Sequence, residues 1–256
     1  MTRLIVLAAT VGLAGCDAFD STRDAIDGLT NPSIALGLVI AVDEPEEADL
    51  SSTDLEVGTA FSLFLGDASS AADIENAPIN NATVTLEGVQ TDDPTEGVYL
   101  ITPDRGLVYE DGATWQVAMS LPSGEASATL ELPIAPDFDP ITEQTAGTGV
   151  SIDLTGQGYN AVVVVVIEAS SGDLTYSTEP QTAREVYDLT RGNDEVTGIE
   201  VPGEAFPSEN EVYVLGIAGL NHANGADVDG VNSLLSSVSA GKMVFQPVST
   251  FPPLPE

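Results

Sequence analysis

Three sets of residues in this 256-residue chain are of types that carry chemistry. The only cysteine, Cys16, offers a thiol, and the only histidine, His222, offers a general base. A cluster of amide and carboxylate side chains between residues 221 and 232 offers hard oxygen ligands of the kind that Ca²⁺ prefers. The surrounding sequence indicates which of these chemistries to expect.

Cys16 ends an N-terminal segment that is typical of a secretory signal peptide. Arg3 precedes an uncharged run of apolar and small residues from 4 to 15. This run is too short to span a bilayer, which needs about 20 apolar residues. The stretch Leu13-Ala14-Gly15-Cys16 resembles the lipobox of bacterial lipoproteins. The resemblance implies cleavage before Cys16, a diacylglyceryl group on its thiol and a further acyl chain on the new amino group.

Such a lipid anchor determines where the protein is expected to be. Each buried methylene contributes about 0.8 kcal/mol, so two or three acyl chains give stable attachment to a lipid bilayer. We therefore expect an exported protein of the bacterial cell envelope, attached to either the inner or the outer membrane. The alternatives are an ordinary signal peptide or a buried core cysteine. An intrachain disulfide is excluded, because the chain has no second cysteine.

The chain is strongly acidic along its whole length after Cys16. It has 41 Asp and Glu against 6 Lys and Arg, for a formal net charge of −35. Such a surface repels nucleic acid and anionic headgroups, so nucleic acid is not an expected partner. Adaptation to a saline habitat and a general gain in solubility both explain this composition.

His222 lacks the sequence context of a catalytic residue, since no GxSxG motif accompanies it and the lipid would occupy Cys16. The best metal candidates are Asn221, Asn224, Asp227 and Asp229. Their spacing does not match an EF-hand, because Gly225 and Ser236 stand where the first and last ligands belong. A Ca²⁺ site of another kind is the weaker alternative to a polar turn. No other cofactor is expected.

Short segments of alternating hydrophobicity predict an all-β fold with little helix. The clearest pair flanks the turn Pro122-Ser123-Gly124, where alternate residues on each side are apolar. The apolar positions of this pair are Trp115, Val117, Met119, Leu121, Ala126, Ala128, Leu130 and Leu132. Comparable strands recur about every ten residues, which is typical of antiparallel β-sandwiches.

The prolines at 136 and 140 divide the pattern and predict two β-sandwich domains in tandem. The expected organisation is a signal peptide (1–15), a lipidated tether (16–32), a first sandwich (33–136), a linker (137–146), a second sandwich (147–249) and a proline-rich tail (250–256). Within the second segment, apolar residues at 231, 234, 235 and 238 are compatible with a short helix.

The second segment resembles a fibronectin type III or immunoglobulin-like module. The likeness rests on "YNAVVVVVIEASSGDLTYST", "TGIEVPGEAF" and "ENEVYVLGIAGL", the last of which carries the aromatic Tyr213. The first segment is similar to prealbumin- or immunoglobulin-like modules through "GVYLITPD" and "DGATWQV". The cysteine pair of a true immunoglobulin domain is missing. The resemblance implies a sandwich and no particular activity.

The run Ala161–Ile167 is apolar on both faces, which is unusual for a sandwich strand. It indicates a central strand covered on both sides. The alternative interpretation makes Val162, Val164 and Val166 an interface with a partner.

The sequence therefore predicts a lipid-anchored binding or structural module of the cell envelope, without catalysis, whose partner is another envelope protein. The alternatives are a Ca²⁺-dependent adhesin that uses the 221–232 loop and, as the less favoured one, a hydrolase.

Overall fold

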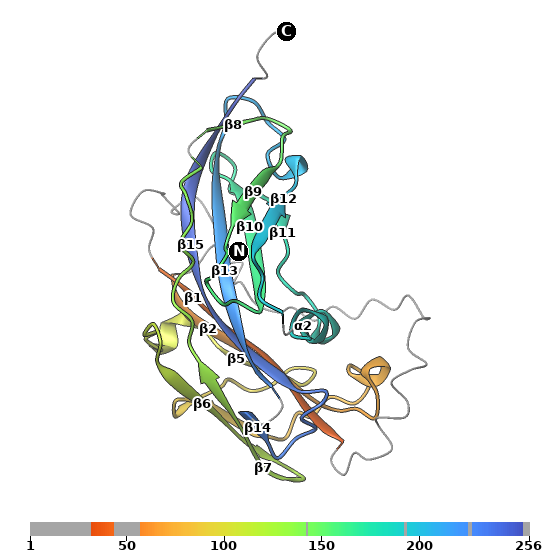
Figure 1. Ribbon diagram of the computed structural model, residues 1–256. Helices are drawn as coiled ribbons and strands as arrows, with labels where there is room; N and C mark the ends of the chain where they lie inside the picture. Colours follow the sequence, from red (N-terminus) through yellow and green to blue (C-terminus); the bar gives the residue numbers. More distant parts are fainter. Residues whose placement is uncertain (1–31, 44–56, 142, 192–193, 225–226, 253–256) are drawn as a thin grey trace.

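A computed structural model describes residues 32–43, 57–141, 143–191, 194–224 and 227–252 (Figure 1). The regular secondary structure of the described chain is almost entirely β-strand, which confirms the predicted all-β fold. Its largest sheet has 8 strands, in the order β11-β10-β13-β15-β1-β2-β5, with β8 also paired to β15. These strands are β1 (Ser33–Val42), β2 (Gly58–Asp67), β5 (Val98–Ile101), β8 (Glu143–Thr145), β10 (Ala161–Glu168), β11 (Leu174–Ser177), β13 (Val212–Asn224) and β15 (Ser237–Phe251).

Two smaller sheets complete the fold. The 5-stranded sheet has the order β14-β7-β6-β3-β4, and a 2-stranded sheet joins β12 to β9. Their strands are β3 (Thr83–Leu86), β4 (Val89–Gln90), β6 (Thr114–Leu121), β7 (Gly124–Glu131), β9 (Val150–Asp153), β12 (Gly198–Val201) and β14 (Val228–Asp229). Three 3-10 turns, η1 (Ala71–Asp73), η2 (Pro103–Arg105) and η3 (Gly203–Ala205), lie between strands.

The first core lies between the 5-stranded sheet and the β1, β2 and β5 part of the large sheet. The predicted hairpin supplies one wall: β6 and β7 pair in antiparallel register across a two-residue turn, from Leu121 opposite Gly124 to Thr114 opposite Glu131. Trp115, Val117 and Met119 are buried on the inner face of β6 while the residues between them are exposed. The alternation seen in the sequence therefore marks the inner and outer faces of this sandwich.

The second core lies on the other part of the large sheet, beneath β9 and β12. Leu215 and Ile217 of β13 are completely buried there against Val201 and Phe206. Tyr213 packs edge-on against Phe206, with ring centroids 5.5 Å apart. The sheet of β9 and β12 and this part of the large sheet therefore form a second pair of packed layers.

The two cores share one sheet, because two long strands run through both. β13 pairs with β15 over its 13 residues, from Val212 opposite Ser249 to Asn224 opposite Ser237. At one end of this ladder, Val238 and Ala240 of β15 belong to the first core, and at the other end Val248 belongs to the second. β14 also lies in the sheet of the first core, although it comes from the second predicted segment. The large sheet therefore crosses the predicted domain boundary.

The chain around the predicted boundary, from Pro133 at the end of the first predicted domain to Thr145 in the predicted linker, is hydrogen-bonded to both predicted domains. The hydroxyl of Tyr109 donates to the carbonyl of Pro133 at 2.8 Å, and that of Tyr159 donates to the carbonyl of Ile134 at 3.0 Å. Further along, the Ile141 amide donates to Gln246, and β8 pairs in parallel with the end of β15. The division at 137–146 stays a prediction. The structure adds that hydrogen bonds anchor this segment.

Helix α2 (Ala183–Leu189) covers the outer face of the large sheet at β1. Val186 and Tyr187 of the helix are buried with Ile34 and Leu36 of β1. The helix expected between 231 and 238 is wrong. That segment follows β14 as an irregular turn and then enters β15. Its apolar residues do not share one face: Val231 and Val238 lie in the first core, Leu235 lies beneath α2 and Leu234 is exposed.

Candidate functional site

The predicted lipidation site, Cys16, lies outside the described residues. The other predicted site residues fall in the 221–232 region and in β10.

The four Ca²⁺ candidates are placed on different elements. Asn221 lies in β13. With its side-chain nitrogen facing the carbonyls of Leu220 and Gly158, the amide donates to both of them at 3.3 Å each. Asn224 ends the same strand, whereas Asp227 and Asp229 are exposed near and within β14. The Asp229 carboxylate accepts the N–H of Gly230 at 2.9 Å.

Among the described residues, no three His, Cys, Asp or Glu side chains are grouped closely enough to hold a metal ion. The Ca²⁺ interpretation of this loop stays a prediction.

The valines of β10 lie within the protein. Val164 and Val166 are buried in the second core, and Val162 packs at its edge. The intervening Ala161, Val163 and Val165 are buried on the opposite face. Since the side chains of Val164 and Val166 fill the core, they are not available as the partner surface that the alternative interpretation required.

His222 has a partner that the sequence did not indicate. Its Nδ1 lies 2.8 Å from Oγ of Ser239, which is the residue opposite it in the β13–β15 ladder. Burial lowers the pKa of His222 to about 4, so the ring is neutral at pH 7. The Ser239 side chain is completely buried, and Nε2 of His222 is buried without a hydrogen-bond partner.

The His222–Ser239 pair has the spacing of a base and a nucleophile but lacks the remaining parts of a catalytic site. A triad needs an exposed hydroxyl and a third group that orients the ring. Ser239 is inaccessible to substrate, and no carboxylate accepts from Nε2. The pair joins two neighbouring strands within the sheet.

Glu179 is a second ionisable group, partly buried, that sequence analysis missed. It stands just after β11 and before α2, beside the buried Pro180. Burial raises the pKa of its carboxyl to about 7, because desolvation penalises the charged form. In a chain with 41 acidic residues, nothing local in the sequence distinguishes this one.

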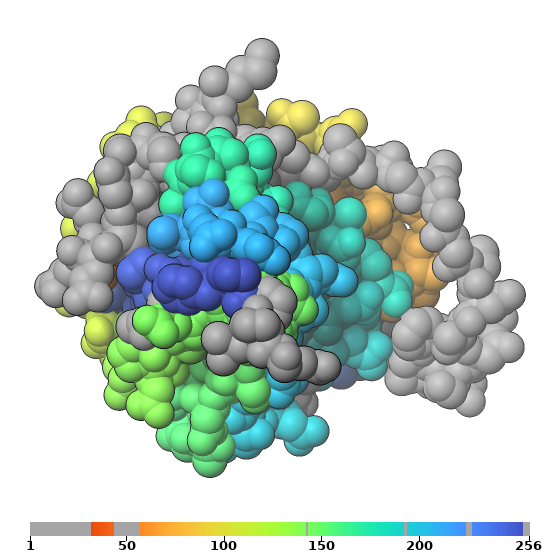
Figure 2. All heavy atoms as spheres, turned by 90° about the horizontal axis from the view of Figure 1, so that it is seen from above, coloured from red at the N-terminus to blue at the C-terminus, as the bar shows by residue number. Residues whose placement is uncertain are grey.

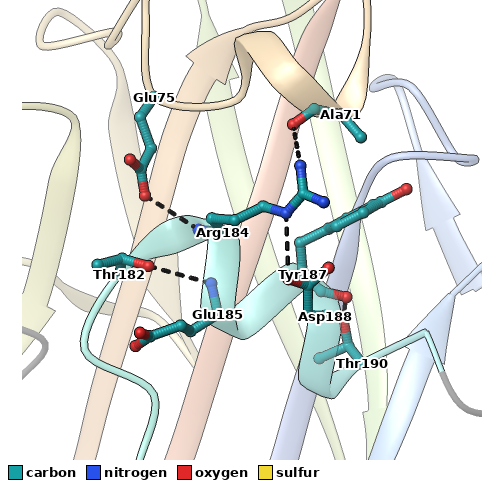
Figure 3. Close-up of polar contacts among 8 residues, drawn as sticks. All are labelled: Ala71, Glu75, Thr182, Arg184, Glu185, Tyr187, Asp188 and Thr190. Carbon is teal, nitrogen blue, oxygen red and sulfur yellow. Dashed lines mark hydrogen bonds and ion pairs between the residues drawn. The ribbon is translucent and has the colours of Figure 1, made fainter. Parts of the chain in front are cut away.

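The start of α2 binds the turn that follows β2 (Figure 3). The Arg184 guanidinium donates to the carbonyl of Ala71 at 2.8 Å and pairs with Asp188 at 3.1 Å. The Arg184 backbone N–H donates to the carboxylate of Glu75 at 3.1 Å. Thr182 caps the helix by accepting the N–H of Glu185. The helix therefore connects elements more than 100 residues apart in the sequence.

Each basic residue of the described chain contacts a group of the same chain. Arg105 pairs with Asp92 at 2.7 Å, and Lys242 pairs with Asp43 at 2.7 Å and with Asp111 at 3.5 Å. Arg184 and Arg191 both lie against the ring of Tyr187, at 5.6 and 5.2 Å from its centroid. Most carboxylates consequently have no cation beside them, and the surface is anionic.

No family model matches the chain, and no curated protein is significantly similar to it in sequence. Among solved structures it is similar to titin domains A168–A170, with 11% identity and a TM-score of 0.21 over 84% of this chain and 66% of that one. It is also similar to the titin tandem Ig domains A164–A165, with 9% identity and a TM-score of 0.19 over 85% of this chain and 96% of that one. A third is DIP-gamma IG1+IG2, with 9% identity and a TM-score of 0.18 over 87% and 98%.

These neighbours are Ig-domain proteins, but at such TM-scores the description of the fold rests on the sheets themselves. In the part of the chain that the structure describes, no helix is long and apolar enough to cross a membrane.

Proposed function

We propose that this chain is an exported lipoprotein of the bacterial cell envelope that acts as a binding or structural module and performs no catalysis. The attachment would use acyl chains on Cys16, and the partner would be another envelope protein. Leu13-Ala14-Gly15-Cys16, placed after a basic residue and an apolar run, supports the anchor.

One structural observation carries the module role: the β13–β15 ladder runs unbroken through both cores. A body whose layers share a sheet keeps its two ends at a fixed separation. The polar pair with catalytic spacing, His222 and Ser239, is enclosed in the same sheet. These features suit a scaffold that presents surfaces better than an enzyme that must admit substrate.

The anchor is tested by replacing Cys16 with Ala and measuring both incorporation of labelled palmitate and fractionation with membranes. We expect the variant to lose the label and to leave the membrane fraction. A matched control, Cys16→Ala combined with Ser21→Cys, moves the thiol by five residues and should not restore labelling. Continued membrane association of the Cys16→Ala variant would show that the attachment lies elsewhere.

A further inference from the structure

The sheet of β9 and β12 has a different neighbour on each side. On the β9 side, the Gln144 side chain of β8 donates to the carbonyls of Thr148 and Gly149, just before β9, at 2.7 and 2.9 Å. On the β12 side, no strand of the described chain pairs with Gly198–Val201. Figure 2, the view from above, shows this sheet at the lower border of the molecule, where the green segment near residue 150 lies beside the light-blue segment near residue 200. β12 is therefore an edge strand, and we call its unpaired side the β12 edge.

Backbone donors and acceptors point outward at the β12 edge. The N–H of Leu154 donates to the carbonyl of Thr197 at 2.9 Å, at the start of the antiparallel β9–β12 pairing. Bonded and non-bonded residues alternate in such a pair, so the residues two and four positions after Thr197 bond to β9. The N–H and C=O groups of Gly198 and Glu200 point away from β9. Both residues are exposed, and no backbone hydrogen bond from either one to another described element is present.

On its inner face, the β12 edge borders a side of the second core that is incompletely covered. Val201 is completely buried there, but Ile199 of β12 and Tyr176 of β11 are only partly buried where they pack against the core. The hydroxyl of Thr175 in β11 donates to the carbonyl of Ala205 in η3 at 2.8 Å, so the last strand of the 8-stranded sheet lies close to the end of β12. A strand added to β12 would extend the inner layer on this side of the core.

On its outer face, the β12 edge is negatively charged. Glu200 is exposed and forms no ion pair within the described chain. Asp153 of β9 is exposed opposite Gly198, and it points to the same face as Glu200 because residues two apart on a strand share a face. No basic residue stands in β9, β12 or η3. The edge therefore combines an open backbone with carboxylates that have no cation of their own.

We propose that the β12 edge binds an extended segment of another protein, which adds as a third strand antiparallel to β12 and carries alternating basic and apolar side chains. The segment's residues opposite Gly198 and Glu200 form the backbone hydrogen bonds, and their basic side chains lie on the outer face beside Glu200 and Asp153. The apolar side chains between them lie beside Ile199 and Val201. The inference rests on the proposed binding role and specifies its partner.

A second copy of this chain is a less suitable occupant of the β12 edge. Two β12 strands paired with each other would bring both Glu200 carboxylates onto one face, and like charges on neighbouring strands destabilise the pairing. A charged side chain on an edge strand opposes such self-pairing in general. The same charge attracts a basic segment, so it selects between the two occupants.

The probes are two synthetic seven-residue peptides of the same sequence, Val-Lys-Val-Lys-Val-Lys-Val, that differ only in which backbone amides are N-methylated. In the proposed pairing the Lys amides face β12 and the Val amides face solvent. Methyl groups on the Lys amides remove the donors to β12, whereas methyl groups on the Val amides keep these donors and prevent the peptide from pairing with itself. Titrated against the full chain carrying Cys16→Ala, the Val-methylated peptide should bind at least about tenfold more tightly than the Lys-methylated one.

Two proline variants identify the strand to which the Val-methylated peptide binds. Glu200→Pro removes an outward N–H of the β12 edge, and an edge strand tolerates proline where the N–H faces solvent. Ser151→Pro is the matched control, because Ser151 is opposite Glu200 in β9 and its N–H points away from β12. Glu200→Pro should weaken binding about tenfold, and Ser151→Pro should leave it unchanged.

Glu200→Lys tests the charge and replaces the proline variant if that variant melts early. It keeps the backbone donors of β12 and reverses the charge on the outer face. The Val-methylated peptide should bind this variant about threefold less tightly, and the same peptide with Glu in place of Lys should bind it more tightly than it binds the wild type.

Several results would overturn the proposal. Equal binding of the two methylated peptides would mean that charge alone attracts them. Binding that Ser151→Pro weakens and Glu200→Pro does not would place the added strand beside β9. Self-association of the chain that Glu200→Pro abolishes would identify a second copy as the occupant. None of these outcomes bears on the lipid anchor, which labelling and fractionation of Cys16→Ala test separately.

Discussion

The imidazole of His222 and the hydroxyl of Ser239 form a contact of 2.8 Å between opposite residues of β13 and β15. The environment of this contact affects the free energy of unfolding, because it holds the His222 ring in its neutral form.

His222 should make the protein less stable in mild acid. Its pKa is lowered from 6.5 to about 4 by burial. As the pH falls through this interval the unfolded state takes up a proton and the folded state does not, so the free energy of unfolding decreases. The full loss is about 3 kcal/mol. Urea denaturation between pH 7.5 and 4 should show a steeper decline for the wild type than for His222→Gln, and parallel curves would contradict this.

Glu179 should have the opposite pH dependence. Burial raises its pKa from 4.5 to about 7, so the folded state keeps the proton that the unfolded state releases. Its contribution is present below pH 4.5 and is lost as the pH rises through 7. Glu179→Gln, which stays neutral, should therefore be more stable than the wild type at pH 8 by about 3 kcal/mol and equal to it at pH 4. Glu200→Gln, which changes an exposed carboxyl of β12, is the control and should show no such gain.

The shared sheet predicts that both cores unfold together. Gly219 lies in the middle of β13, where a Cβ would be 2.5 Å from the ring of Tyr159. Gly219→Ala should lower the free energy of unfolding by about 2 kcal/mol and move one calorimetric transition as a whole. Adding Tyr159→Leu should recover part of the loss. Two transitions, of which Gly219→Ala shifts only one, would show that the halves are independent.

Salt should stabilise the protein, because it screens repulsion among carboxylates that have few cations beside them. We expect the melting temperature to rise between low salt and 1 M NaCl. At 1 M the Debye length falls to about 3 Å, so carboxylates farther apart than this no longer repel one another appreciably. Lys242→Gln removes the cation between Asp43 and Asp111 and should lower the melting temperature by about 2–4 °C at low salt. At 1 M NaCl this difference should shrink, and a difference independent of salt would exclude an electrostatic origin.

Local pattern was enough to predict the strands, because each face of a sandwich strand meets either a core or water. The β6–β7 hairpin shows this directly, with Trp115 and Val117 buried and Gln116 exposed between them. This kind of pattern did not predict the length of β13 and β15, nor that both strands run through the two cores. β13 is apolar or glycine on both faces from Val212 to Leu220, and β15 mixes polar and apolar residues on both faces, so the alternation that reveals orientation is absent.

The helix lies at Ala183–Leu189 and not at 231–238, where apolar spacing alone indicated one. The correct signal was present as Thr182 followed three residues later by Glu185, an arrangement that favours a helix start. The His222–Ser239 contact was beyond local analysis, since it depends on the register between strands 17 residues apart.

The parallel pairing of β1 with β15 has a mechanical consequence. β1 begins at Ser33, on the side of the chain from which a lipid anchor would pull, and β15 ends at Phe251. Tension between these points acts along the two strands in opposite directions and loads every pair from Leu36–Ser237 to Val42–Met243 at once. Such a ladder yields by shear, in which all its hydrogen bonds must break together, whereas a hairpin pulled from its open end opens one bond at a time. A protein held at a membrane by one end and by a partner at the other would resist rupture along this line.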